Sequence, residues 1–179
     1  MAYRAQIVML LGRTAGCVSA AHVGGPSTTF YRQDIAVSSE GSPYYRIPAL
    51  AVTNRGTVLA AFDARSTLSD LPSNIRVVLR RSTDDTRTFG DQIVVRADSA
   101  PHGYGDPSFV VERKTGRVFL FYAAGELQGY MGSHTGVNDH DPNILQADYS
   151  YSDDDGLTWR SRRDLAPTRT SPSNWPMAG

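Results

Sequence analysis

The sequence predicts an all-β fold assembled from repeated hairpins, and two observations support this prediction. Short runs rich in β-branched and aromatic residues recur at short intervals, separated by turn signals, and no amphipathic helix of appreciable length stands out. The pattern S-x-D-x-G-x-T-W of Ser152–Trp159 occurs again in Ser82–Phe89, with Thr86 in place of the glycine and phenylalanine in place of the tryptophan. Short strands of this kind build sandwiches, barrels or propellers, and a repeated hairpin signature favours stacked or radial units.

The expected strands follow one another through most of the chain. Asn54 and Gly56 lie between two of them, and both residue types tolerate the positive φ of a hairpin turn. In each copy of the repeated pattern, the serine and aspartate side chains would hydrogen-bond within the turn and the aromatic ring would pack beneath it. The expected strands are Ile47–Val52, Thr57–Phe62, Ile75–Arg81, Gln92–Val95, Phe109–Glu112, Arg117–Tyr122 and Ile144–Tyr151.

Three segments are expected along the chain. Residues 1–28 are predicted to be a leader and linker, residues 29–166 the repeated β domain, and residues 167–179 an irregular tail. The apolar run Ile7–Leu11 follows a basic residue, as in an export signal, but Arg13 interrupts the apolar stretch. A secreted or cell-surface protein and a cytoplasmic one therefore both stay open.

Composition excludes several classes of function. Lys and Arg number 18 and Asp and Glu number 18, and this neutral balance predicts no nucleic-acid partner. No apolar run reaches the roughly 20 residues of a membrane span. Cys17 has no second cysteine to join it in a disulfide or a cysteine-based zinc site, and the four histidines show no zinc-ligand spacing. We therefore expect neither a metal nor another cofactor.

The repeated pattern resembles the Asp box of sialidases. Tyr45–Leu50, with the sequence Y-R-I-P-A-L, resembles the Y/F-R-I-P motif that opens the sialidase catalytic domain. Phe62–Arg65, a polar loop with Asp70, and Gly105–Ser108 then follow in the family's order. The resemblance is to the N-terminal portion of the catalytic domain of bacterial exo-α-sialidases. It implies a six-bladed β-propeller, of which this chain, at roughly 40–50 residues per blade, would supply about three blades.

The same resemblance implies an activity, the hydrolysis of terminal α-linked sialic acids on glycoproteins, glycolipids and oligosaccharides. Arg46 would be one of three arginines that hold the carboxylate of the sugar. An arginine suits this task because its planar fork pairs with two oxygens and stays charged when desolvated. A surface ion pair made by an edge-strand arginine is the alternative for this residue.

Asp70 would be the catalytic residue, acting first as general acid and then as general base. Such a group must be partly desolvated to hold a proton near neutral pH. A plain turn or a helix cap is the alternative. Arg65 would border the sugar and Asp106 would line its site. Their alternatives are an ion pair of Arg65 with Asp63 or Asp70, and an Asp-Pro turn at Asp106.

The resemblance also implies parts that this chain does not contain. Sialidases use a tyrosine nucleophile activated by a glutamate, and these residues and the other two arginines would lie in later blades. We therefore expect the chain by itself to be inactive on sialosides. A non-catalytic glycan-binding or structural Asp-box module is the competing hypothesis.

Overall fold

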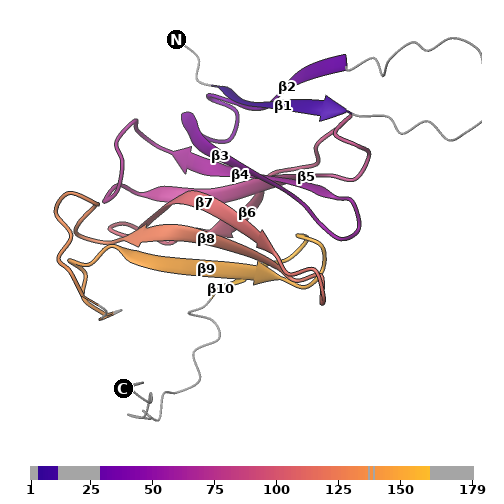
Figure 1. The fold of residues 1–179 in the computed structure, drawn as a ribbon. Coiled ribbons are helices and arrows are strands. Elements are labelled where there is room, and N and C mark those ends of the chain that lie inside the picture. The colour runs from indigo at the N-terminus through magenta and orange to yellow at the C-terminus, as the bar shows by residue number, and fades with distance from the viewer. Residues whose placement is uncertain (1–3, 12–28, 137, 139, 162–179) are drawn as a thin grey trace, which may run out of the picture.

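The structure is a computed structural model, and it describes residues 4–11, 29–136, 138 and 140–161. These residues form three antiparallel sheets stacked in chain order (Figure 1). Among them no helix is long and apolar enough to cross a membrane. The strands are β1 (Arg4–Leu11), β2 (Thr29–Val37), β3 (Tyr44–Val52), β4 (Val58–Arg65), β5 (Ile75–Ser82), β6 (Ile93–Arg96), β7 (Gly103–Val111), β8 (Val118–Gly125), β9 (Gln146–Ser152) and β10 (Arg160–Ser161).

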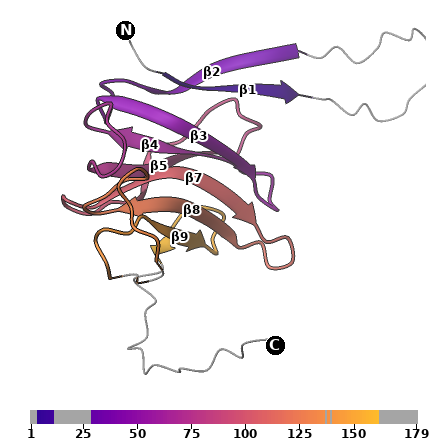
Figure 2. The same cartoon turned by 60° about the vertical axis from the view of Figure 1, so that its left-hand side comes forward.

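The two four-stranded sheets are the blades of a partial β-propeller. Blade 1 has the order β3-β4-β5-β6, and blade 2 has the order β7-β8-β9-β10, so each is an antiparallel meander. The third sheet contains only β1 and β2, which pair over their whole length beside blade 1 (Figure 2). Three stacked sheets agree with the expected all-β propeller fold. The first sheet contains β1, which lies within residues 1–28, the predicted leader and linker.

Each of the seven expected strands overlaps one of β3 to β9, with ends that differ by a few residues, and the largest difference lies at the start of β7. This strand begins at Gly103, well before the expected start at Phe109. The added residues include two glycines, an aspartate and a proline, which disfavour strands in isolation. They form one here because a bulge between Gly105 and Ser108 absorbs the aspartate and the proline.

The same local structure occurs in blade 1, which shows that the blades are copies of one unit. A bulge lies between Arg46 and Ala49, and the residue before each proline has positive φ: 52° at Ile47 and 58° at Asp106. The ring of Tyr45 meets Phe62 edge-on at 5.3 Å between centroids, as Tyr104 meets Tyr122 at 5.6 Å. The repeat thus extends from the Asp boxes to the first strand of each blade.

Strand β4 lies at the centre of the structure, because all eight of its residues are buried. One face carries Ala60, Phe62 and Ala64, which pack with Tyr45 and with residues of β2. The other face points at blade 2, where Ala61 joins a second cluster. Burying one large apolar side chain stabilises a fold by roughly 1.5–3 kcal/mol, so these two clusters hold the sheets together. The second cluster consists of Ala61, Val77, Leu79, Tyr104, Leu120, Tyr122 and Ala124.

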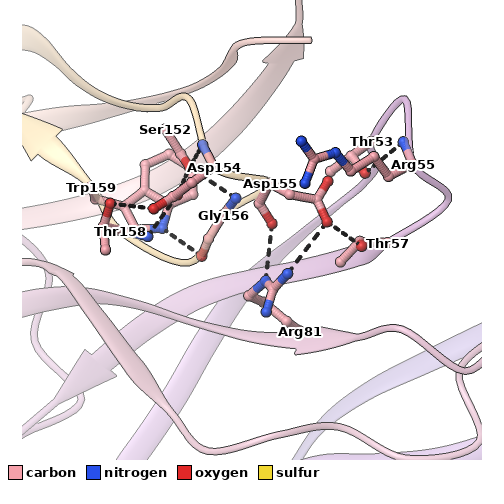
Figure 3. A network of polar contacts seen from close by, with 10 residues as sticks. All are labelled: Thr53, Arg55, Thr57, Arg81, Ser152, Asp154, Asp155, Gly156, Thr158 and Trp159. Atoms are coloured by element: carbon pink, nitrogen blue, oxygen red, sulfur yellow. Dashed lines mark hydrogen bonds and ion pairs between the residues drawn. The ribbon is translucent and has the colours of Figure 1, made fainter.

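The Asp box of blade 2 also fastens the blades to each other, as Figure 3 shows. Arg81 of blade 1 donates from Nε to the carbonyl oxygen of Asp155 at 2.9 Å, and its Nη2 lies 3.3 Å from the Asp155 carboxylate. The hydroxyl of Thr57 donates to the same carboxylate. In the box of blade 1 the matching residue, Asp85, is exposed.

Within each box the expected hydrogen bonds are present and nearly identical. Asp154 Oδ1 accepts from the Thr158 amide at 2.8 Å, and Asp84 Oδ1 accepts from the Thr88 amide at 3.0 Å. The serine hydroxyl of each box accepts the amide of the fifth residue, which has positive φ: 82° at Gly156 and 64° at Thr86. A β-branched residue at such a φ is strained, and Thr86 Oγ1 is also buried without a hydrogen-bond partner.

We expect Thr86→Gly to stabilise the protein. The change removes the strained φ and the unsatisfied buried hydroxyl, worth roughly 1–3 kcal/mol each, against about 0.5–1 kcal/mol of added chain entropy in the unfolded state. The free energy of unfolding in urea should therefore rise by at least about 1 kcal/mol.

The matched control is the reverse change in the other box, Gly156→Thr. A Cβ at Gly156 would lie 2.8 Å from Leu59 Cδ2 and would be held at a φ of 82°. This variant should lose about 2–4 kcal/mol. If Thr86→Gly and the wild-type chain had the same free energy of unfolding, the backbone strain inferred at Thr86 would be contradicted.

Candidate active site

The most deeply buried charged groups of the described residues lie at the end of β4. Asp63 and Arg65 are two residues apart, so they share the face that points at blade 2. Their exposures are 0% and 1%. Arg65 Nη2 and Nε lie 2.6 and 3.0 Å from Asp63 Oδ2, an ion pair with two hydrogen bonds. Pairing of this kind offsets the cost of taking both charges out of water.

Asp70 joins this pair from the loop 66–74, which links β4 to β5. Arg65 Nη1 lies 2.6 Å from Asp70 Oδ1 and 3.1 Å from the carbonyl oxygen of Ser69. One buried guanidinium therefore bridges two carboxylates, and both ion pairs that the sequence analysis weighed for Arg65 are present. The Asp70 side chain itself is 73% exposed, so the partial desolvation expected of a general acid is absent among the described residues.

Asp106 reaches the cluster through its main chain. Its amide donates to Asp63 Oδ1 at 3.0 Å, whereas its own side chain is exposed. The positive φ at the bulge of β7 turns this amide toward blade 1. Asp63 therefore accepts hydrogen bonds from both blades, and it joins the end of β4 to the first strand of blade 2.

Arg46 lies in β3, the edge strand of blade 1, directly opposite Asp63 in the register of β3 and β4. Its side chain is half-buried. Among the described residues its guanidinium has no hydrogen bond or ion pair, so the surface ion pair considered for this residue is absent there. The structure thus gathers three of the four expected site residues, Arg46, Arg65 and Asp106, around Asp63, and Arg65 connects Asp70 to the same group.

Asp63, which the sequence pattern indicates only as a possible partner of Arg65, is the centre of this cluster. A signal for it exists in the sequence. Val58–Arg65 is an apolar run whose only charged residues are Asp63 and Arg65, spaced to lie on one face of a strand. Two opposite charges in a strand that is otherwise apolar predict a buried ion pair.

Burial governs the electrostatics of Asp63. Desolvation raises the pKa of its carboxyl from 3.8 to about 6, and the hydrogen bonds and charge of Arg65 oppose this effect only in part. For Arg65, burial acts to lower the pKa, but its hydrogen bonds with Asp63 and Asp70 leave the pKa raised.

The pKa of Asp63 predicts a specific dependence of stability on pH. Between pH 4 and 6 the folded chain holds this proton more tightly than the unfolded chain does. The contribution of Asp63 to stability is therefore fully present below pH 4 and is lost as pH rises through about 6. Compared with Asp63→Asn, which does not titrate, the wild-type free energy of unfolding should fall by about 2 kcal/mol between pH 4 and pH 7.

Urea unfolding of both chains at several pH values measures this difference, and titrating groups that the two chains share cancel. The opposite trend would be a wild-type free energy of unfolding that rises relative to that of Asp63→Asn as pH increases through 4. It would mean that the attraction of Arg65 outweighs the cost of burial, and it would contradict the raised pKa of Asp63.

Comparisons with known proteins add to this geometry. The chain is 44% identical over 155 residues to a sialidase of Micromonospora viridifaciens, covering 84% of this chain and 24% of that protein. It is 31% identical over 159 residues to a sialidase of Bacteroides fragilis, covering 80% and 29%. It is also 31% identical over 138 residues to a sialidase of Clostridium perfringens, covering 75% and 35%. The chain thus spans about a quarter to a third of these relatives. No protein-family model matches it.

Solved structures agree in fold. The Hadza microbial sialidase Hz136 superposes with a TM-score of 0.62 at 26% identity, over 74% of this chain and 32% of that one. The intramolecular trans-sialidase from Ruminococcus gnavus superposes with a TM-score of 0.56 at 18% identity, over 69% and 49%. The second of these likenesses concerns the fold only.

Proposed function

The chain belongs to the sialidase family, and we propose that it supplies the first blades of an exo-α-sialidase that hydrolyses terminal α-linked sialic acids of glycoconjugates. The observation that carries this proposal is the arrangement at the end of β4. Arg65 is fully engaged by two carboxylates, whereas the guanidinium of Arg46, opposite Asp63 in the neighbouring strand, has no partner among the described residues. A half-buried guanidinium with no partner among the described residues is suited to binding an anionic sugar.

Arg46 is the group proposed to bind the carboxylate of sialic acid. A guanidinium without a competing carboxylate can form both hydrogen bonds of a bidentate pair with a ligand. Arg65 cannot do the same without giving up Asp63 or Asp70, and its role in this proposal is to border the sugar and orient the acid. Asp106 lines the site from blade 2 with an exposed side chain.

Asp70 is the proposed general acid and base. Arg65 holds Asp70 Oδ1, and among the described residues Oδ2 accepts no hydrogen bond. One oxygen is thus oriented and the other is open for proton transfer. In the first step Oδ2 would give its proton to the glycosidic oxygen as the bond to the aglycone breaks. In the second step it would take a proton from the attacking water.

A non-catalytic glycan-binding module is the second candidate function, and the exposure of Asp70 favours it. Desolvation helps a carboxylic acid to stay protonated near neutral pH. The Asp70 side chain is 73% exposed, so it is little desolvated. Both candidates bind sialosides through Arg46. Only the enzyme needs Asp70 for turnover, so kinetics separates the two.

We expect Asp70→Ala to impair turnover most for poor leaving groups. The test uses a chimaera in which residues 29–166 replace the corresponding segment of the Micromonospora viridifaciens sialidase. An alkyl sialoside needs protonation of its leaving oxygen, which contributes roughly 100- to 10,000-fold, whereas a nitrophenyl sialoside needs little. A chimaera that is active before this change and loses equally on both substrates after it would exclude the role of Asp70.

Arg46→Lys in the same chimaera should weaken binding of sialic acid. A single ammonium cannot replace a bidentate fork, and the lost charge-assisted contact is worth on the order of 2–3 kcal/mol. Titration calorimetry measures the change, and Arg113→Lys, at the exposed turn between β7 and β8, is the control that should bind normally. Unchanged affinity of Arg46→Lys would rule out the carboxylate contact.

The chain of 179 residues is expected to show no turnover of a fluorogenic sialoside by itself. It would supply one of the three arginines that hold the carboxylate and no tyrosine nucleophile. Each missing residue would remove a contact that lowers the energy of the transition state. Activity that disappears in Asp70→Ala would show instead that these blades suffice.

A further inference from the structure

The loop 66–74, which carries Asp70, crosses two glycines of blade 2 at distances that leave no room for a side chain. A Cβ built on Gly129 would lie 1.9 Å from the carbonyl oxygen of Leu71. One built on Gly103 would lie 2.0 Å from the carbonyl oxygen of Ser73. Both neighbours are main-chain atoms, so neither contact could be relieved by rotating a side chain.

Close approach, and not backbone conformation, is the reason for glycine at these positions. Gly125 lies nearby but differs, because a Cβ there would meet Leu71 Cβ at an ordinary 3.4 Å and its tightest neighbour would be the carbonyl oxygen of Gln128, in blade 2 itself, at 3.0 Å. None of the three has a positive φ. Gly56 is the opposite case, because it has a φ of 82° and open space around it. Gly103 and Gly129 therefore form a socket for the loop.

The loop is fastened on both sides of this socket. On the side of blade 1, Arg65 holds the carbonyl oxygen of Ser69 and the carboxylate of Asp70. Toward β5, the Asn74 side chain donates to the carbonyl oxygens of Asp98 and His102 at 3.0 and 2.7 Å. The glycine socket lies between these two points.

We propose that Gly103 and Gly129 position the acid/base Asp70 by seating its loop, an inference that rests on the function proposed above for this residue. A methyl group at Gly129 must push Leu71, the residue next to Asp70, away from blade 2. The carboxyl group then leaves its place beside Arg65 and beside the sugar. A displacement of about 1 Å costs a catalytic group roughly 100-fold in rate.

Gly129→Ala in the chimaera tests the proposal, with Gly90→Ala as the control. A Cβ at Gly90 would have its nearest neighbour at 3.7 Å, an ordinary contact, and its φ is not positive. Gly129→Ala should lower kcat/KM for an alkyl sialoside by about 100-fold and for a nitrophenyl sialoside much less, in parallel with Asp70→Ala. Gly90→Ala should leave both unchanged. Equal losses on the two substrates in Gly129→Ala would overturn the positioning role.

Amide hydrogen exchange in the chain of 179 residues gives a second readout that needs no catalysis. The Ser73 amide donates to the carbonyl oxygen of Asp70 at 3.2 Å, so it reports the shape of the loop. Gly129→Ala and the independent variant Gly103→Ala should speed its exchange while amides of β5 and β8 stay protected. Wild-type exchange in both variants would overturn the socket. An Asp70→Ala chimaera without a leaving-group effect would instead overturn the proposed function of Asp70.

Discussion

The structure depends on one constraint, the burial of β4 on both of its faces. Alternate residues of this strand pack toward β2 on one side and toward blade 2 on the other. A strand buried in this way has no solvent-facing side on which to place a charge. Asp63 and Arg65 must therefore pair with each other, and their further partners come from the loop 66–74 and from β7. The acid and arginine cluster is the polar end of an otherwise apolar interface between blades.

Contacts elsewhere in the protein serve the same interface. The Asp box of blade 2 contacts Arg81 and Thr57 of blade 1 at one position, and the glycines of blade 2 receive the loop of Asp70 at another. In both places a main-chain carbonyl group of one blade directly contacts the other blade: that of Asp155 meets Arg81, and those of Leu71 and Ser73 lie against the glycines. The site is therefore shaped by how blade 2 seats on blade 1 as much as by the residues that touch a ligand.

Much of this fold could be predicted from the sequence, because strands and turns are local. The runs of β-branched and aromatic residues lie in β3 to β9, and both Asp boxes form the expected hydrogen bonds. What could not be predicted depends on contacts between distant segments. Gly103 and Gly129 look like ordinary turn residues until the loop 66–74 is seen against them. Desolvation of Asp70 was expected, whereas Asp63 is the carboxyl that burial affects, because β4 is covered and the loop is not.

Native-state hydrogen exchange of a cavity variant, Leu120→Ala, tests most directly whether the two blades share one core. Leu120 is fully buried in β8 on the face toward blade 1, and its truncation should cost about 2–5 kcal/mol. If burial by blade 2 holds β4 in place, the amides of β4 should lose protection by the same factor as those of β8. Loss of protection in β8 with β4 unchanged would contradict the account, because blade 1 would then be stable without the packing of blade 2.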